Sequence, residues 1–235
     1  MKKIFLLIFA ILIAACSSKK EGNMIVNVQI KGLKKGTMYL QKISNDSIVK
    51  TIDSVAILGT DTFTLTANVE EPEIHFVTFD GNTSNKYITF FAEKGTINIV
   101  DDVAKFGINP VISGSKNQEI LDQYYKISNR FNNQNLDLIK GKFLAQKNNN
   151  IDSINLIDKQ HESLLRRRYL VTVNFALNNA SNNVAPYIAL TELVNANVKL
   201  LDTIQSSLSV DVKKSLYGKK LTKFISDIKK EERKK

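Results

Sequence analysis

The spacing of apolar residues changes near residues 113–115, and this change constrains the fold more than any other feature of the chain. From Met24 to about Ile112, apolar and polar residues alternate, as in Thr62–Ala67, where phenylalanine, leucine and alanine follow threonines. A period of two is typical of strands that bury one face. Five or more such strands with Gly, Asn and Asp turns predict an antiparallel β-sandwich or a strongly curved sheet. We expect the outer faces of the strands to be polar and solvated.

After this point the apolar residues follow helical spacing, beginning with Ile120 and Tyr124. The Asn and Gln residues at 132–135 are expected to interrupt or weaken the first helix. Further helices are predicted at 151–177, 185–195, 200–208 and 210–230. Strands followed by helices indicate an α+β chain, with a β-rich domain at 24–113 and a helical region at 114–235.

The first 16 residues, MKKIFLLIFAILIAAC, read as a secretory signal that ends at the only cysteine. Two lysines precede an apolar run, Ile4–Ile13, which is shorter than the roughly 20 residues that a membrane-spanning helix needs. Residues Ile13–Cys16 resemble the lipobox of bacterial lipoproteins, in which cleavage occurs before the cysteine and the cysteine is then acylated. We therefore expect a signal peptide at 1–15 and a lipidated tether at 16–23, with palmitate or a similar lipid on Cys16.

The formal net charge is +10, and it falls by two to +8 when the lysines of the signal are removed. Such a charge suits an anionic partner, but export makes nucleic acid the least expected one. We expect the chain in the cell envelope, anchored through Cys16 to the inner or outer membrane, on the periplasmic side. A single cysteine allows no intramolecular disulfide, and its acylation leaves no thiol for redox or nucleophilic chemistry.

Several short motifs resemble one family of envelope proteins. They are Asp53–Ser54 before a Phe-x-Leu strand, Glu71–Pro72, and the Ile-x-Gly-Ser element at Ile112–Ser115. These motifs resemble the β-rich domain of unknown function that lies N-terminal to thioredoxin-like, AhpC/TSA-type domains in lipoproteins of Gram-negative bacteria. The stretches Phe175–Ser181 and Tyr217–Leu221 resemble the helical connector that follows that domain.

The resemblance implies an accessory module and not an enzyme. In the longer relatives the chemistry belongs to a CxxC motif in the thioredoxin-like domain, and this chain contains no CxxC. No catalytic residue can therefore be transferred from the family, and we expect neither a cofactor nor a metal.

Few other residues are candidates for chemistry. His161 opens a zincin-like stretch, but Leu165 stands where the second histidine would be needed, so a structural histidine is favoured, as it is for His75. The loop Asp80–Asn85 is rich in side-chain oxygens but lacks the spacing of a calcium-binding loop. The carboxylates of Asp101–Asp102 would form a catalytic pair only if both faced one cleft.

We expect the helical region, and not the sheet, to present a partner surface. Tyr125, Tyr169 and Tyr187 lie beside the apolar stripes of their helices, and Arg166 and Arg168 lie close to one of them. Aromatic residues next to arginine are favoured at protein interfaces. The alternatives are that the tyrosines pack against the sheet and that the arginines form a solvated face.

These observations favour a membrane-anchored envelope lipoprotein that binds or scaffolds an envelope protein without catalysis. One alternative is an accessory partner of a separately encoded thioredoxin-like thiol–disulfide protein, as an unlinked version of the longer relatives. A second alternative is a hydrolase with a carboxylate site, which would require an acidic cleft.

Overall fold

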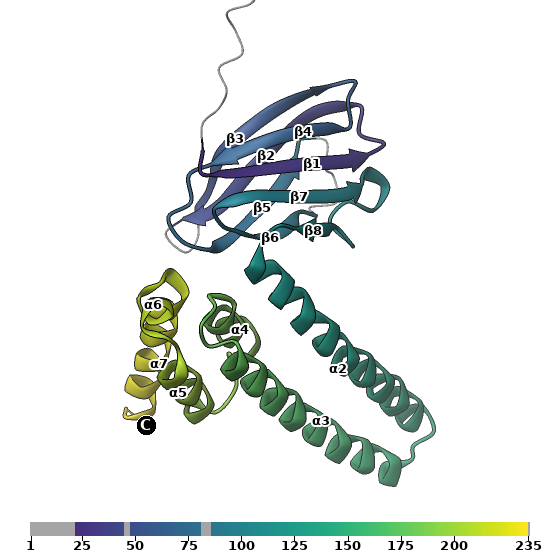
Figure 1. The fold of residues 1–235 in the computed structure, drawn as a ribbon. Helices are drawn as coiled ribbons and strands as arrows, with labels where there is room; N and C mark the ends of the chain where they lie inside the picture. The colour runs from purple at the N-terminus through teal and green to yellow at the C-terminus, as the bar shows by residue number, and fades with distance from the viewer. Residues whose placement is uncertain (1–21, 45–47, 81–85, 235) are drawn as a thin grey trace, which may run out of the picture.

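The computed structural model describes residues 22–44, 48–80 and 86–234, and it places the strands before the helices (Figure 1). The strands are β1 (Met24–Lys31), β2 (Lys35–Ser44), β3 (Ile48–Leu58), β4 (Thr62–Ala67), β5 (Glu73–Phe79), β6 (Ile88–Ala92), β7 (Gly95–Asp102) and β8 (Val111–Ser113). The helices are the short η1 (Val103–Lys105), α2 (Lys116–Lys147), α3 (Ile151–Asn178), α4 (Val184–Glu192), α5 (Val198–Ser207), α6 (Val210–Lys214) and α7 (Leu216–Glu232). This order confirms the predicted α+β class.

Three predicted features lie wholly or mainly outside the described residues. They are the signal peptide, Cys16 with most of its tether, and most of the oxygen-rich loop at 80–85. Within the described part of the chain, no helix is both long and apolar enough to span a membrane.

The strands form two four-stranded sheets, ordered β4-β1-β7-β8 and β3-β2-β5-β6. The prediction of an antiparallel sandwich is correct for the layers but wrong for one pair, because β1 and β7 run parallel from Met24 opposite Gly95 to Lys31 opposite Asp102. The chain visits the second sheet between β1 and β4 and again between β4 and β7. As a result, β4 lies on one side of β1 and runs antiparallel to it, while β7 lies on the other side and runs parallel to it.

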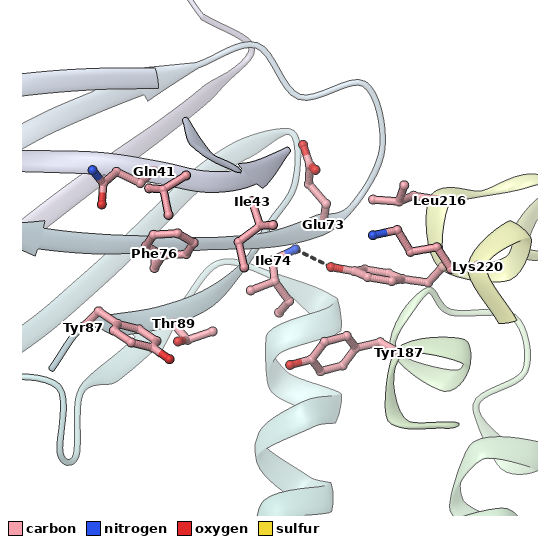
Figure 2. A pocket seen from close by; sticks show the side chains of 12 residues that line it. Gln41, Ile43, Glu73, Ile74, Phe76, Tyr87, Thr89, Tyr187, Leu216 and Lys220 are labelled. Atoms are coloured by element: carbon pink, nitrogen blue, oxygen red, sulfur yellow. Dashed lines mark hydrogen bonds between the residues drawn. The ribbon is translucent and has the colours of Figure 1, made fainter. Parts of the chain in front are cut away.

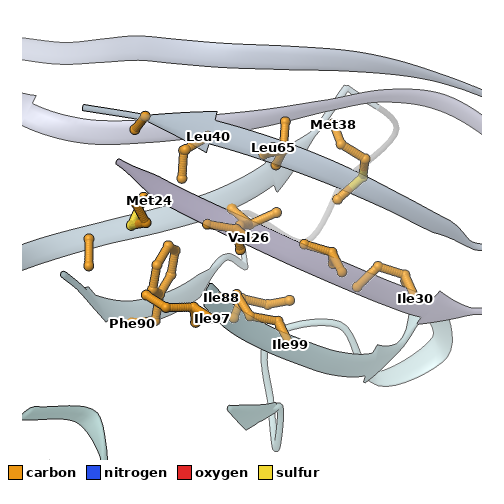
Figure 3. Packing of buried hydrophobic residues seen from close by; sticks show 14 of the residues in the cluster. Met24, Val26, Ile30, Met38, Leu40, Leu65, Ile88, Phe90, Ile97 and Ile99 are labelled. Carbon is orange, nitrogen blue, oxygen red and sulfur yellow. The ribbon is translucent and has the colours of Figure 1, made fainter. Parts of the chain in front are cut away.

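The core of the sandwich is built by the inward positions of both sheets (Figure 3). Alternate residues of β1, such as Val26 and Val28, are buried against Leu40 of β2 and Phe90 of β6 in this cluster. The period of two in the sequence therefore identified the buried face correctly. Burying such side chains contributes about 1.5–3 kcal/mol each.

Helices α2 and α3 form a long antiparallel hairpin, while α4 to α7 form a separate group of shorter helices (Figure 1). The predicted interruption at 132–135 is wrong, because α2 continues without a break to Lys147. Asn and Gln lower helix stability by only a few tenths of a kcal/mol each, and contacts with α3 outweigh that cost. Capping by Ser115 and Asn150 begins α2 and α3, because each side chain accepts a backbone N–H of the first turn.

The last predicted helix, at 210–230, is divided in two at Ser215. This residue has an extended backbone, with φ −70° and ψ 169°, and its side chain caps α7 by accepting the Gly218 N–H. A Cβ atom at Gly218 would lie 2.0 Å from the Val212 carbonyl oxygen, so only glycine allows α6 and α7 to approach this closely. The break directs the start of α7 toward the second sheet.

Candidate functional site

The outer face of the first sheet is polar, as the sequence predicts. Thr64, Asn27 and Asn98 lie in one row across β4, β1 and β7. The Asn27 side-chain amide donates to Asn98 Oδ1 at 3.2 Å, and Thr64 Oγ1 donates to Asn27 Oδ1 at 3.3 Å. The three side chains therefore form hydrogen bonds with one another at the surface, which is ordinary for a solvated sheet.

The outer face of the second sheet is apolar and aromatic only in part, near the helices, and there the expectation of a polar outer surface is wrong. Phe76 lies between Gln41 and Thr89 in one row across β2, β5 and β6. The next row pairs Ile74 with Phe91, which is fully buried although it points away from the sandwich core. A sheet with apolar residues on both faces needs a second layer to cover it.

Helices α2, α4 and α7 provide that layer around Phe91. Its ring lies 5.3 Å from the ring of Tyr187 on α4 and 6.0 Å from the ring of Tyr217 on α7, both edge to face. Leu121 and Tyr124 of α2 belong to the same buried cluster. This cluster, which we call the junction core, is separate from the core between the two sheets.

Hydrogen bonds attach the helices to strand groups that the sheet leaves without partners. Pairing of β2 with β5 ends at His75, and the next amide, that of Ile74, donates to the Tyr217 hydroxyl at 2.8 Å. Strand β6 is an edge strand, and its Phe91 N–H donates to Gln118 Oε1 of α2 at 2.9 Å. Each bond satisfies a backbone group that burial would otherwise leave unpaired.

Two glutamates of the β-rich part anchor helix N-termini. Glu93 accepts the backbone N–H of Lys116 and, at 2.7 Å, the side-chain amide of Asn117. Glu71 accepts the Leu216 N–H at 2.7 Å, at the start of α7. Carboxylates at these positions complement the positive ends of the helix dipoles. They hold α2 and α7 against the second sheet.

A pocket of about 630 Å³ opens beside the junction core, between the second sheet and helices α4 and α7 (Figure 2). It is lined by Gln41, Ile43, Val49, Glu73, Ile74, Phe76, Tyr87, Thr89, Tyr187, Leu216, Tyr217 and Lys220. Its size and its apolar, aromatic walls with a few polar groups are those of small-ligand sites. Figure 2 shows the strand side chains facing Leu216, Lys220 and Tyr187 on the helices.

Glu73 is the acidic group at the pocket. Its Oε1 lies 2.6 Å from Lys42 Nζ and 3.3 Å from His75 Nε2. Burial alone raises the pKa of Glu73, but the hydrogen bonds with His75 and Lys42 outweigh burial and hold this pKa below its usual value. His75 itself is buried on the inner side of β5, so it does not line the pocket.

The tyrosine hydroxyls at the pocket are held in their neutral form. Burial raises the pKa of Tyr217 and of Tyr187. Burial also raises the pKa of Tyr125, and the neighbouring Tyr187 raises it further. These groups can therefore donate or accept hydrogen bonds at neutral pH but supply no charge.

The structure brings together only two of the five residues predicted to form a partner surface. Tyr187 lines the pocket, and Tyr125 lies beside it with 41% of its surface exposed. Tyr169 packs instead against the core of the short helices. Arg166 is exposed on α3.

Arg168, the fifth predicted residue, holds helices together. Its guanidinium donates to Glu192 Oε2 at 2.8 Å, joining α3 to α4. The same carboxylate oxygen accepts from the Tyr124 hydroxyl at 3.2 Å, and that hydroxyl lies 3.0 Å from Thr172 Oγ1. This hydrogen-bond network joins α2, α3 and α4 next to the junction core.

The other sequence candidates also have structural roles. Asp101 accepts the Gly107 N–H at 2.7 Å and Asp102 caps the short η1 helix, so the two carboxylates do not share a cleft. His161 is exposed on α3. Across residues 22–44, 48–80 and 86–234, no three His, Cys, Asp or Glu side chains gather closely enough to hold a metal ion.

The pocket residues of β5 and β6 were not identified from the sequence as site residues. The available signal was that apolar residues occupy both parities of the two strands, as Ile74 to Val77 and Ile88 to Phe91 show. Such strands are buried on both faces. The pattern therefore indicated a covering layer, although not which helices form it.

Comparison with known proteins gives one partial match. The model of a family described as a domain of unknown function (DUF4369) matches residues 24–121. No curated protein and no solved structure matches the chain. The matched range covers the whole sandwich and the first turns of α2, including Asn117 and Gln118, which attach the helix to the sheet. The β-rich part of the chain is thus similar to this domain of unknown function.

Proposed function

We propose that this chain is a lipid-anchored, non-catalytic binding module of the cell envelope, and that the pocket beside the junction core receives its partner. The observation that carries the proposal is the uncovered part of the second sheet's outer face. Tyr87, Ile43 and Val49 are 54–56% exposed at the pocket, next to the buried Phe91. Exposed apolar and aromatic side chains in a concave site favour binding.

The partner suited to this site is an apolar or aromatic group that also carries a hydrogen-bonding function. Phe76, Ile74 and Leu216 offer apolar contact, while Gln41 and Thr89 offer polar atoms in the same walls. A protein segment with one large apolar side chain fits this chemistry and the volume. The proposal supplies no catalytic step.

Photo-crosslinking in intact cells tests the site. A photoreactive phenylalanine analogue replaces Tyr87 in the full-length chain, and the matched control places it at Val111, which is 67% exposed on the first sheet. We expect a discrete crosslinked product from position 87 and none from position 111. Equal products from both positions, or none from position 87, would refute the pocket as the binding site.

The anchor is tested separately. The motif Ile13–Cys16 supports lipid attachment at Cys16, and stable anchoring requires two or more acyl chains, since one gives only marginal binding. Cells are fed an alkyne fatty acid, and label is compared between the wild type and Cys16→Ser. We expect the label to disappear in the variant, and equal labelling would contradict the proposal.

A further inference from the structure

Helix α2 carries two stripes of residues whose spacing alternates between three and four. The inner stripe faces α3: Tyr124 bonds Thr172, and Phe131 and Leu138 each share a surface depression with Leu164. The outer stripe consists of Tyr125, Asn129, Asn132, Leu136, Ile139 and Phe143. This spacing is that of the contact seam in a coiled coil. The helix is therefore patterned to pack on two sides.

The outer stripe is exposed where it is most apolar. Leu136, Ile139 and Phe143 are 52%, 53% and 66% exposed, near the end of the hairpin that projects from the rest of the molecule (Figure 1). Single exposed apolar residues need no explanation, but three successive positions of one seam form a continuous patch. The patch is separate from the pocket beside the junction core.

The charge around this patch differs from that of the whole chain. Residues 134–162 contain four lysines and four acidic residues, so this part of the hairpin has no formal net charge, whereas the chain carries +10. An anionic membrane or a nucleic acid would find no excess positive charge here. Two copies of the chain would therefore meet no excess of like charge at this surface.

We propose that two copies of this chain pair through the outer stripe of α2, antiparallel and with a two-fold axis close to Ile139. This arrangement places Leu136 of one copy beside Phe143 of the other. Asp137 and Lys140 flank the stripe, 4.0 Å apart with more than three-quarters of each side chain exposed. The two-fold axis places Asp137 of one copy at nearly the same height along the helix as Lys140 of the other, so both charges of a pair occur beside the stripe.

The size of the contact indicates a reversible dimer. Two helix segments of this length bury on the order of 1,000 Å² in total, which is the lower limit for a specific interface. The polar positions Asn129 and Asn132 confine the apolar contact to the end of the hairpin and fix its register. Two hairpins joined in this way form a four-helix arrangement, which hides apolar residues that one hairpin cannot bury alone.

Disulfide crosslinking in cells tests the pairing with the full-length chain. In Ile139→Cys the new thiols of two copies lie at the axis, and the control Val210→Cys places a thiol on α6, at a residue that is 65% exposed. After mild oxidation we expect at least a tenfold greater yield of a dimer-sized product from Ile139→Cys than from the control or the wild type. Equal yields, or a product of another mass, would overturn the proposal.

Sedimentation of the detergent-solubilised full-length chain provides a second readout. Phe143→Glu is expected to shift the population to monomer, whereas Leu144→Glu, at a neighbouring residue that is 57% exposed but off the stripe, leaves the dimer in place. Because both residues are exposed, thermal unfolding should change little in either variant. A dimer that survives Phe143→Glu, or a wild type that is monomeric at all concentrations tested, would overturn the proposal.

Discussion

The two sheets of the sandwich share one core, but among the described residues only the second sheet has outward apolar residues that helices cover. On the first sheet, the row formed by Thr64, Asn27 and Asn98 is a chain of surface hydrogen bonds. On the second sheet, the neighbouring outward positions Ile74 and Phe91 are apolar, and helices cover them. The difference shows that the inward alternation of a strand determines which face enters the core, while the outward residues determine what the other face contacts.

The second sheet is also where the β-rich part of the chain contacts the helical part. Its free backbone groups bond to Tyr217 and Gln118, and its buried Phe91 packs against α4 and α7. The pocket lies on a neighbouring part of the same face, at the edge of the helices. An apolar surface that the described helices cover only in part favours the binding of another molecule.

The largest expected effect on stability comes from comparing one outward residue of each sheet. Phe91→Ala removes a fully buried side chain from the junction core and should lower the free energy of unfolding by about 3–5 kcal/mol. Asn98→Ala, at an outward position of the first sheet, should change it by at most about 0.5 kcal/mol. Urea unfolding followed by far-ultraviolet circular dichroism measures both. A loss below about 1 kcal/mol for Phe91→Ala would mean that the helices do not cover the sheet.

A second comparison uses two helical glycines. In Gly218→Ala the new Cβ would meet the Val212 carbonyl oxygen at 2.0 Å, so α7 must move, and we expect a loss of about 1–3 kcal/mol. In Gly141→Ala the Cβ would make an ordinary contact with Ile157 at 3.4 Å, and alanine favours the helix by about 0.5–1 kcal/mol. Thermal unfolding of both variants should therefore shift in opposite directions. A neutral Gly218→Ala would contradict the close approach of α6 and α7.

The hydrogen bond between the sheet and α7 should have a smaller effect. Tyr217→Phe leaves the Ile74 N–H without its acceptor, which should cost about 1–2 kcal/mol of unfolding free energy. Tyr87→Phe removes a hydroxyl from a residue that is 54% exposed, and its effect should stay within about 0.5 kcal/mol. Equal effects in chemical denaturation would show that this bond does not attach the helices.

The smallest expected effect depends on pH. Because the pKa of Glu73 is lower in the folded chain than in the unfolded chain, its ionised form stabilises the fold above the ordinary carboxyl pKa. That contribution disappears as the pH falls through the lowered pKa of the folded state. Glu73→Gln should therefore be less stable than the wild type near neutrality and should lose less stability between about pH 5 and pH 3. Parallel stability curves for the two proteins would contradict this assignment.

The sequence predicted the layers of the fold better than the way they meet. Alternation identified the inward residues of β1 and β4, and helical spacing identified α2 and α3, because both signals come from local burial. The parallel pairing of β1 with β7 could not be predicted, since it depends on the path of the chain between the sheets. The break at Ser215 depends likewise on how closely α6 approaches α7.

The candidate site was harder to predict for the same reason. The sequence predicted Tyr187 as part of a partner surface, but its neighbours in the pocket come from β2, β3, β5, β6 and α7. Arg168 looked similar in the sequence and instead pairs with Glu192. An aromatic or cationic residue beside a helical stripe indicates contact, but only the packing of distant elements decides whether that contact is internal.

The central claim is that helices shelter the outer face of the second sheet and leave a pocket there, while the first sheet faces solvent. The chain contains no tryptophan, so Phe76→Trp and Thr64→Trp each introduce one reporter at an outward position, one on each sheet. Quenching of their fluorescence by acrylamide measures access of solvent to each face. We predict a blue-shifted emission and several-fold weaker quenching for Phe76→Trp than for Thr64→Trp. Equal quenching of the two variants, with both folded by circular dichroism, would contradict the account.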